Sequence, residues 1–552
     1  MGAKSLDVDC NNGKCGSGDK LDVDAMVRFD SIESINIVQR SMKDSFGPRL
    51  VSFKGMLAPV QNVNRGGLGL PLLLLAFAQS ASLLWQHGPE MIGLIQKATA
   101  NIYTSIASEY LSATVAAIAS AIIFLLAMWR MFWNSGPSPI YLVDFACFKP
   151  ADECKMTNEV FLALSAKSGL FTEKSMDFQQ KILASSGLGP ETYVPPSMHS
   201  QPPDLTICTS MKEAEMALFT TVGDLLKRTG VKAQDIGILV VNCSTFCPIP
   251  SMSAMVVNHF KMRESIESYH LGGMGCSAGV IAVSLAQDLL KVHKNTYAIV
   301  LSTEMISGMQ GYKGNYRSMM VGNCIFRWGA SAVLLSNKRG DRRVAKYSLV
   351  ELVRTHKAAD DKSFQCVKNT EDADGIIGVS LSRELIHEAG NALKANITTL
   401  APKILPLSEK LKFASNFVAR KILKKSQKPY VPDFQKAINH FCIHPGGKAV
   451  LDGIEKNLQL SKQHMEPSRM TLHRFGNTSS SSIWYVLAYM EAKHRVRKND
   501  LIWQIALGSG LKCNSAVWKS LRNDQFDASA NPWADCVKNY PVSLTPSTSE
   551  PK

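Results

Sequence analysis

The sequence predicts an α/β protein made of two halves of similar content, preceded by an apolar N-terminal region. Between residues 140 and 522, short runs rich in β-branched residues alternate with longer stretches of helical character, and this alternation is typical of α/β folds. The pattern begins again after a broken, charged stretch at residues 337–346. Two apolar segments of nearly membrane-spanning length lie ahead of both halves. We therefore expect a pseudo-duplicated α/β unit behind a membrane hairpin.

Composition and charge limit the kinds of protein and partner that fit this chain. With 552 residues, 45% of them hydrophobic, the chain can form one large or two medium folded units. Its thirteen cysteines are scattered singly, as is usual in a reducing compartment. The net charge of +15 favours an anionic partner such as phospholipid headgroups or a phosphate-bearing substrate. Because the chain carries no RNA- or DNA-binding signature, we expect no nucleic acid partner.

The N-terminal region is predicted to be a tail followed by two transmembrane helices. Residues 1–65 mix Asp, Lys, Gly and Ser with little periodicity, so we expect a mostly disordered cytosolic tail. Within residues 66–135, the spans are expected at about 68–85 and 111–133. Pro71 and several polar residues make the first segment less apolar than the second. Instead of spanning the membrane, it could form a re-entrant or interfacial helix.

Charge around this hairpin predicts its orientation. Lys and Arg recur on both outer flanks and are scarce in the connecting loop, so both ends of the hairpin should face the cytosol. Everything from about residue 140 onward would then be cytosolic and tethered to a membrane. Three glycosylation sequons, at Asn242, Asn396 and Asn477, offer a check, because a glycan on any of them would contradict this topology.

The first predicted half covers residues 140–340. Residues 211–229 are amphipathic and should form a helix, whereas residues 236–242 form a largely apolar run, ending in Asn242, that is typical of a buried strand. Further strands are expected at 296–302 and 331–336.

The second predicted half covers residues 341–522. Its strands are expected at residues 347–353, 441–444 and 501–507, with helices between them. Residues 523–552 are expected to form a C-terminal tail.

The candidate nucleophile is Cys276, in the stretch Leu271–Gly279. Glycines at 272, 273 and 275 allow a tight turn before it, and an apolar run of helical length follows it. A thiol near the first turn of a helix faces free N–H groups and the positive end of the helix dipole, which favours thiolate. The alternative is an inert buried cysteine.

Three further stretches could complete a site around this cysteine. In a strand, His440, Cys442 and His444 would share one face, but no fourth metal ligand is evident, so we expect no metal. His444 precedes a Pro-Gly-Gly loop that would expose it, which makes it the catalytic candidate and leaves His440 a structural residue. Asn477 should lie near a helix N-cap with its amide free to donate, or serve as a plain cap.

The stretch Leu507–Cys513 is predicted to be a strand followed by a glycine-rich loop. It lacks the spacing of a P-loop and of a dinucleotide-binding motif. Its backbone N–H groups could instead line an oxyanion hole.

Residues 408–428 are predicted to form a basic amphipathic helix. Seven Lys and Arg residues alternate there with large apolar ones. Such a helix could rest on anionic headgroups or steer a phosphorylated substrate, or its charges could simply form a solvated face.

These motifs together resemble the plant 3-ketoacyl-CoA synthases, the condensing enzymes of very-long-chain fatty acid elongation. The Cys276, His444 and Asn477 stretches match the Cys-His-Asn triad of that family. The resemblance extends over residues 140–522 and includes the stretches Val143–Cys147, Gly187–Val194, Val241–Cys243, Thr355–Lys357, Val431–Phe434 and Ser509–Trp518. His356, His440 and His473 also match histidines of the family and rank as supporting residues. The segment Met305–Gly314 and the long tail ahead of the hairpin look less standard.

The resemblance implies a fold and a reaction. The fold would be thiolase-like, with two related halves stacked in αβαβα layers, usually as a homodimer. Cys276 would carry a fatty acyl group taken from acyl-CoA, while His444 and Asn477 would stabilise the enolate formed when malonyl-CoA loses CO2. The N–H groups of Cys276 and Gly510 would form the oxyanion hole. Acyl-CoA and malonyl-CoA are thus expected as substrates, with no permanently bound cofactor.

The resemblance also implies a location and partners. We expect a multi-pass protein of the endoplasmic reticulum membrane whose catalytic domain faces the cytosol, working with the reductase and dehydratase of fatty acid elongation. Two alternatives remain open at this point. The chain could be a condensing enzyme of the type III polyketide synthase kind, which is usually soluble, or a non-catalytic scaffold for other elongation subunits.

Overall fold

The structure is a computed structural model that describes residues 119–128, 139–309, 312–421, 426, 430, 432–523, 526–528 and 531–544. The chain divides into two compact units, Met1–Asn134 and Ser135–Lys552. The predicted tail and the first apolar segment lie outside the described residues, and of the second apolar segment residues 119–128 are helical. Among the described ranges, no helix is both long enough and apolar enough to cross a bilayer. The membrane hairpin therefore stays a prediction.

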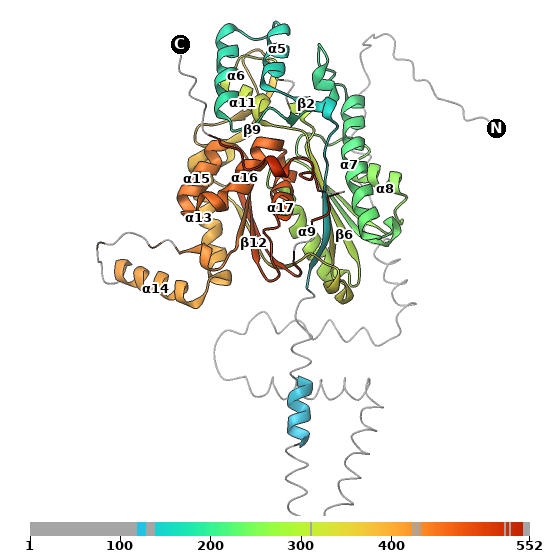
Figure 1. The fold of residues 1–552 in the computed structure, drawn as a ribbon, viewed down its shortest axis with the longest axis vertical. Helices are drawn as coiled ribbons and strands as arrows, with labels where there is room; N and C mark the ends of the chain where they lie inside the picture. Colours follow the sequence, from blue (N-terminus) through green and yellow to red (C-terminus); the bar gives the residue numbers. More distant parts are fainter. Residues whose placement is uncertain are drawn as a thin grey trace, which may run out of the picture. The chain divides into compact units, whose positions relative to one another are not determined.

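A mixed sheet of nine strands forms the frame of the second unit (Figure 1). Its strand order is β11-β12-β13-β8-β1-β7-β6-β4-β5. The strands are β1 (Tyr141–Cys147), β4 (Ile236–Asn242), β5 (Glu267–Leu271), β6 (Tyr297–Thr303), β7 (Ala330–Ser336), β8 (Tyr347–His356), β11 (His440–Ile443), β12 (Leu501–Gly508) and β13 (Lys512–Ser520). Two small antiparallel pairs join β2 (Lys155–Met156) to β3 (Thr192–Tyr193) and β9 (Val367–Glu371) to β10 (Ile377–Leu381).

The two halves repeat one pattern of strand pairing. In the first half, β1 pairs with β7 antiparallel, β7 with β6 antiparallel, and β6 with β4 parallel. In the second half, β8, β13, β12 and β11 pair in the same succession and the same directions. The halves join where Tyr141 and Leu142 of β1 pair with Ser348 and Tyr347 of β8. The pseudo-duplication predicted from the content of the two halves is thus present in the sheet.

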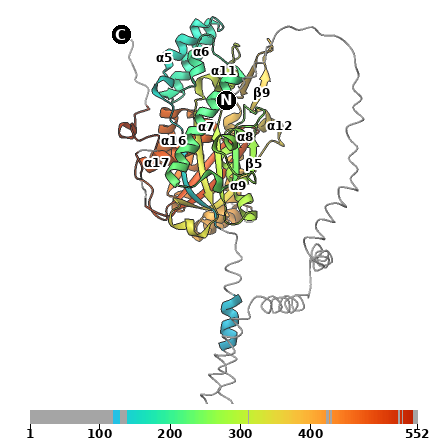
Figure 2. The same cartoon turned by 90° about the vertical axis from the view of Figure 1, so that its right-hand side faces the viewer.

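Helices cover the strands on both faces (Figures 1 and 2). Those that position the site are α9 (Ala278–Val292), α16 (Lys462–Phe475) and α17 (Ser482–Ala492). The others are α5 (Asn158–Lys167), α6 (Glu173–Ser185), α7 (Ile207–Thr229), α8 (Met252–Phe260), α10 (Ile306–Met309), α11 (Arg317–Ile325), α12 (Asp361–Gln365), α13 (Leu385–Ile404), α14 (Leu407–Lys421) and α15 (Lys448–Leu458).

Alternation along the strands shows how the layers are stacked. In β4, Ile238 and Val240 pack in one core with α9, whereas Leu239 and Val241 pack in another with α7, as period-two side chains must. The core around α9 also contains α17 and residues of β12 and β13, while a third core holds α13 and α15 against the other face of those strands. The order is therefore helices, strands, the central pair α9 and α17, strands, helices. This is the layered fold that the resemblance implied.

Residues 531–544, inside the stretch expected to be a C-terminal tail, pack onto the second half. Trp533 is fully buried, and its indole N–H donates to the Tyr485 carbonyl at 3.0 Å. Its ring meets Phe475 and Tyr540 edge-on, with centroids 5.0 and 5.1 Å apart. This segment therefore belongs to the core next to α16 and α17.

Replacing Trp533 with alanine should destabilise the fold. Removing a fully buried Trp leaves a cavity and an unpaired carbonyl, which costs about 3–5 kcal/mol in folding free energy. The measurement is the free energy of unfolding of the full chain, with Tyr316→Ala as the control because the Tyr316 side chain is half exposed. Equal stability of the two variants would show that the segment adds nothing to the core.

Candidate active site

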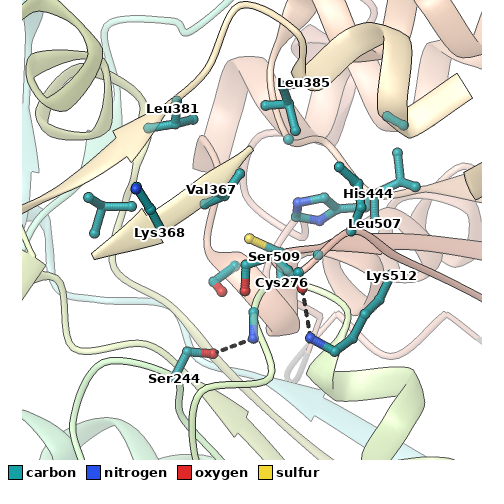
Figure 3. A pocket seen from close by; sticks show the side chains of 18 of the residues that line it. Ser244, Cys276, Val367, Lys368, Leu381, Leu385, His444, Leu507, Ser509 and Lys512 are labelled. Carbon is teal, nitrogen blue, oxygen red and sulfur yellow. Dashed lines mark hydrogen bonds between the residues drawn. The ribbon is translucent and has the colours of Figure 1, made fainter. Parts of the chain in front are cut away.

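A cavity of about 490 Å³ opens between the two halves and is lined by both. Cys276, His444 and Asn477 all line it, as do His356 and the loop around Gly510. Figure 3 shows the Cys276 sulfur and the His444 ring facing each other across the floor of the cavity. The structure thus brings together the three residues that the sequence singled out, although they lie in three distant stretches of the chain.

Two glycine turns packed back to back hold Cys276. Gly275 has a φ of 73°, in the left-handed region, and a Cβ there would lie 2.5 Å from the Ser509 nitrogen. A Cβ on Gly508 would likewise lie 2.5 Å from the Ser277 Oγ. Only glycine allows this approach at either turn. The contact places the cysteine beside the Ser509–Gly510 loop.

The Cys276 thiol is protonated near neutral pH. Burial raises its pKa to about 11; a hydrogen bond with Ser479 acts against this rise, and the charge of Glu304 adds to it. The sequence predicted thiolate from a place at a helix N-terminus, but α9 begins at Ala278, two residues later. Desolvation of the thiol outweighs the pull of the helix. A base would therefore have to remove the thiol proton before the sulfur could act as a nucleophile.

His444 is a neutral side chain beside the thiol. It follows β11, its side chain is buried, and its backbone N–H donates to the Ile505 carbonyl at 2.9 Å. Burial lowers the pKa of its imidazole to about 4. Within the described part of the chain, its Nδ1 has no hydrogen-bond partner. A neutral imidazole with an unused ring nitrogen can accept a proton from a thiol or donate a hydrogen bond to a substrate.

Asn477 is locked in one orientation by its neighbours. Its Oδ1 accepts from the Ser479 N–H at 2.9 Å, so its Nδ2 is the group left to donate. That Nδ2 donates to the Gly446 carbonyl at 3.3 Å, and the Gly446 N–H in turn donates to the His444 carbonyl at 2.8 Å. Asn477 lies directly before Thr478, the N-cap of the 3-10 turn Ser479–Ser481 that leads into α17, so it is near a helix start as predicted. Its amide is not free, because Nδ2 bonds the Gly446 carbonyl.

The backbone on both sides of Asn477 is held by the segment that follows α11. The Asn477 N–H donates to the Ile325 carbonyl at 3.2 Å, and the Arg327 N–H donates to the Asn477 carbonyl at 2.9 Å. The Arg327 side chain is buried and donates to the Thr192 Oγ1 at 2.7 Å. Asn477 is thus fixed by both halves of the protein.

Glu304 is the site residue that the sequence did not reveal. This carboxylate is 2% exposed and lines the cavity. Its Oε1 accepts from the N–H groups of Ser244 and Thr245 at 3.0 and 2.9 Å, and its Oε2 accepts from the Ser479 hydroxyl at 3.0 Å. Through Ser479, the carboxylate reaches the Cys276 thiol. The available signal was an acidic residue directly after a buried strand, just ahead of the segment that looked less standard.

The three supporting histidines separate into two groups. His356 ends β8, lines the cavity and lies near Gly510; burial and then the charges of Lys512 and Arg354 lower its pKa. His440 instead pairs with Asp500, with 2.9 Å between Nε2 and Oδ2. His473 bonds the Tyr540 hydroxyl through Nδ1 at 3.1 Å. Neither of these two is among the residues that line the cavity.

Away from the triad, the cavity wall is mostly apolar. Lys368, Asn369 and Lys512 are among its few polar side chains. The apolar residues come from both halves and include Ile325, Phe326, Phe364, Val367, Val379, Leu381, Leu385, Ala389, Val450, Leu507 and Leu511. Over the described residues, no cluster of His, Cys, Asp or Glu is arranged to hold a metal ion. The site therefore combines a small polar floor with a long apolar wall.

Two substitutions should move the reactivity of Cys276 in opposite directions. Ser479→Ala removes a hydrogen bond that lowers the thiol pKa, so alkylation by iodoacetamide at a fixed mildly alkaline pH should slow several-fold. Glu304→Gln removes a charge that raises the pKa, so alkylation should quicken. The measurement is the pH dependence of alkylation at Cys276 by peptide mass spectrometry, with exposed Cys208 as the internal control. Shifts of the same sign in both variants would contradict the assignment.

Comparison with known proteins identifies the family. Residues 133–422 match the family described as FAE1/Type III polyketide synthase-like protein, and residues 415–522 match the C-terminal domain of chalcone and stilbene synthases. The 3-ketoacyl-CoA synthase 11 of Arabidopsis thaliana is 53% identical over 436 residues, which cover 79% of this chain and 86% of that protein. The 3-ketoacyl-CoA synthase 4 of the same plant is also 53% identical, over 79% of this chain and 84% of its own.

Solved structures share the fold at lower identity. A fungal type III polyketide synthase, ORAS, superposes with a TM-score of 0.55 at 20% identity, covering 69% of this chain and 99% of its own. CsyB complexed with CoA-SH superposes with a TM-score of 0.53 at 17% identity, covering 69% of this chain and all of its own. With this fold, and with identity above one half to full-length relatives, the chain belongs to the 3-ketoacyl-CoA synthase family.

Proposed function

We propose that this protein condenses a long-chain acyl-CoA with malonyl-CoA to give 3-ketoacyl-CoA, CO2 and CoA. This is the first step of very-long-chain fatty acid elongation and makes the protein an acyltransferase. The observation that carries the proposal is the meeting of Cys276, His444 and Asn477 at the floor of one apolar cavity. The apolar wall suits an acyl chain, and the neutral triad suits chemistry on thioesters.

The first step is transfer of the acyl group to Cys276. The thiol gives its proton to the His444 imidazole as the sulfur attacks the thioester carbonyl, and the two charges that form stabilise each other in the buried site. The N–H groups of Cys276 and Gly510 would stabilise the tetrahedral oxyanion. When the C–S bond to CoA breaks, the leaving thiolate takes the proton from His444. The imidazole is then neutral again.

The second step is decarboxylation of malonyl-CoA and formation of the new bond. The C–C bond to the carboxylate breaks, CO2 leaves, and the electron pair becomes an enolate on the thioester oxygen. A ring N–H of His444 and the Nδ2 of Asn477 would donate to that oxygen, each contributing on the order of 3 kcal/mol to the transition state. The enolate carbon then attacks the acyl carbonyl and displaces Cys276 as a thiolate, which takes a proton from solvent.

Three substitutions separate these two steps. Cys276→Ala should abolish condensation, because the acyl carrier is gone. Asn477→Ala should lower malonyl decarboxylation by about 100-fold or more and still form the acyl-Cys276 thioester, since an amide cannot act as a base. His444→Ala should slow both steps. The measurements are release of labelled CO2 and the mass of the Cys276 peptide after incubation with acyl-CoA.

The matched control is His440→Gln, because His440 pairs with Asp500 and does not line the cavity. It should leave the ratio of the two steps unchanged. Condensation that survives Cys276→Ala would overturn the nucleophile assignment, and full decarboxylation in the His444 and Asn477 variants would contradict the enolate role. The same assay with acyl-CoA of several lengths separates the alternatives. A polyketide synthase would extend one chain repeatedly, and a scaffold would form no product.

We infer further that the protein acts at the endoplasmic reticulum membrane with its catalytic domain in the cytosol. An acyl chain too apolar to travel freely favours a tethered enzyme. A homodimer, and association with the reductase and dehydratase of elongation, are proposed from the family. The three sequons do not test this topology, because Asn242, Asn396 and Asn477 are all buried in the fold. Protease protection in sealed microsomes does: cleavage of residues beyond 140 without detergent is expected, and full protection would contradict a cytosolic domain.

A further inference from the structure

Helix α14 carries its large apolar side chains on the outside of the protein. Leu407, Leu411, Phe413, Phe417 and Val418 are between 40% and 69% exposed. At 3.6 residues per turn, these five side chains fall within an arc of about 160° on one side of the helix. Figure 1 shows α14 projecting from the lower part of the α/β unit, away from the sheet. Five large apolar groups thus form one continuous exposed stripe.

The polar side of α14 faces the protein. Glu409 is fully buried and accepts from the Lys436 ammonium at 2.7 Å and from the Asp433 N–H at 3.1 Å. The Asn416 Oδ1 accepts from the Tyr430 N–H at 3.0 Å. A surface helix ordinarily buries its apolar side and exposes its polar side. On α14 the polar side is buried and the apolar side is exposed. Packing within the fold therefore does not account for the apolar stripe.

The charged side chains of α14 that reach solvent are basic: Lys412 is exposed, and Lys410 and Arg420 are half-buried. Glu409 is the only acidic residue of the helix, and it is buried. Lys410 lies inside the apolar arc, and Arg420 lies at its edge next to Phe413. Of the basic side chains described on α14, only Lys412 forms an ion pair, with Glu409 at 3.3 Å. The exposed face of the helix is therefore apolar and cationic at once.

We propose that the outer face of α14 docks on the surface of an anionic phospholipid bilayer. The apolar stripe would enter the region between headgroups and acyl chains, and Lys410 and Arg420 would meet the headgroup phosphates. A second copy of the chain fits this face poorly, because two such cationic faces would repel each other. The proposal rests on α14 alone and depends neither on the condensation reaction nor on the predicted membrane hairpin.

The first test replaces Phe413 or Phe417 with the photo-reactive residue p-benzoylphenylalanine in the full chain, reconstituted in nanodiscs that contain phosphatidylserine. Illumination should attach phospholipid at both positions. The matched control is Tyr316, an aromatic residue that is 52% exposed on a different face; it should acquire no lipid. Attachment to a second copy of the chain or to another protein, or the absence of any adduct at 413 and 417, would overturn the proposal.

The second test measures the role of charge. Amide hydrogen exchange of residues 407–421 should be slower in nanodiscs that contain phosphatidylserine than in discs of phosphatidylcholine alone. Lys410→Gln with Arg420→Gln should make exchange in the two kinds of disc more alike, because each charge contributes about fivefold to the affinity for an anionic surface. Equal exchange in both lipids would contradict an anionic surface as the occupant. Condensation activity in detergent shows that each variant is folded, so loss of docking and loss of the proposed function are distinguishable.

Discussion

The site depends on close backbone contacts that only glycine permits. Gly275 meets Ser509, Gly508 meets Ser277, and a Cβ on Gly279 would lie 2.6 Å from the Ser480 carbonyl oxygen. These contacts bring the start of α9 against the turn that leads into α17, so that residues from the two halves share one cavity floor. A methyl group at any of these positions would force the two halves apart. The distance between nucleophile and donors is thus set by backbone rather than by flexible side chains.

Burial keeps two of the side chains at the cavity floor uncharged at rest. The thiol of Cys276 and the imidazole of His444 are each pushed by desolvation toward their uncharged forms, the thiol by a raised pKa and the imidazole by a lowered one. In the proposed reaction, charge would develop on them only when a thioester is attacked or a carboxylate is lost. Fixed donors in a medium of low polarity act most strongly on such charge. Glu304 tunes this balance, because it orients Ser479 while its own charge opposes ionisation of the thiol.

The parts of the structure that depend on residues close together in the chain could be predicted from the sequence. The largely apolar run at 236–242 coincides with β4, because a strand buried on both faces is made mostly of apolar residues. The glycine turn, the Pro-Gly-Gly loop and the capping Asn477 were likewise visible as short motifs. Glu304 was missed because its partners lie 60 and 175 residues away in the chain. The pKa of Cys276 was mispredicted for a similar reason, since desolvation depends on tertiary packing around the thiol.

Duplication of one half explains why the site lies between the two. In each half, a helix of the central layer comes just before the second-to-last strand. In the first half, α9 precedes β6, which pairs antiparallel with β7. In the second half, α17 precedes β12, which pairs antiparallel with β13. Cys276 lies in the turn before α9, and Asn477 lies in the turn before α17. The two turns meet at the Gly279–Ser480 contact. One repeated geometry therefore supplies two helix starts at a single cavity. In the proposed reaction, the difference in side chain would make one of them the acyl carrier and the other the donor.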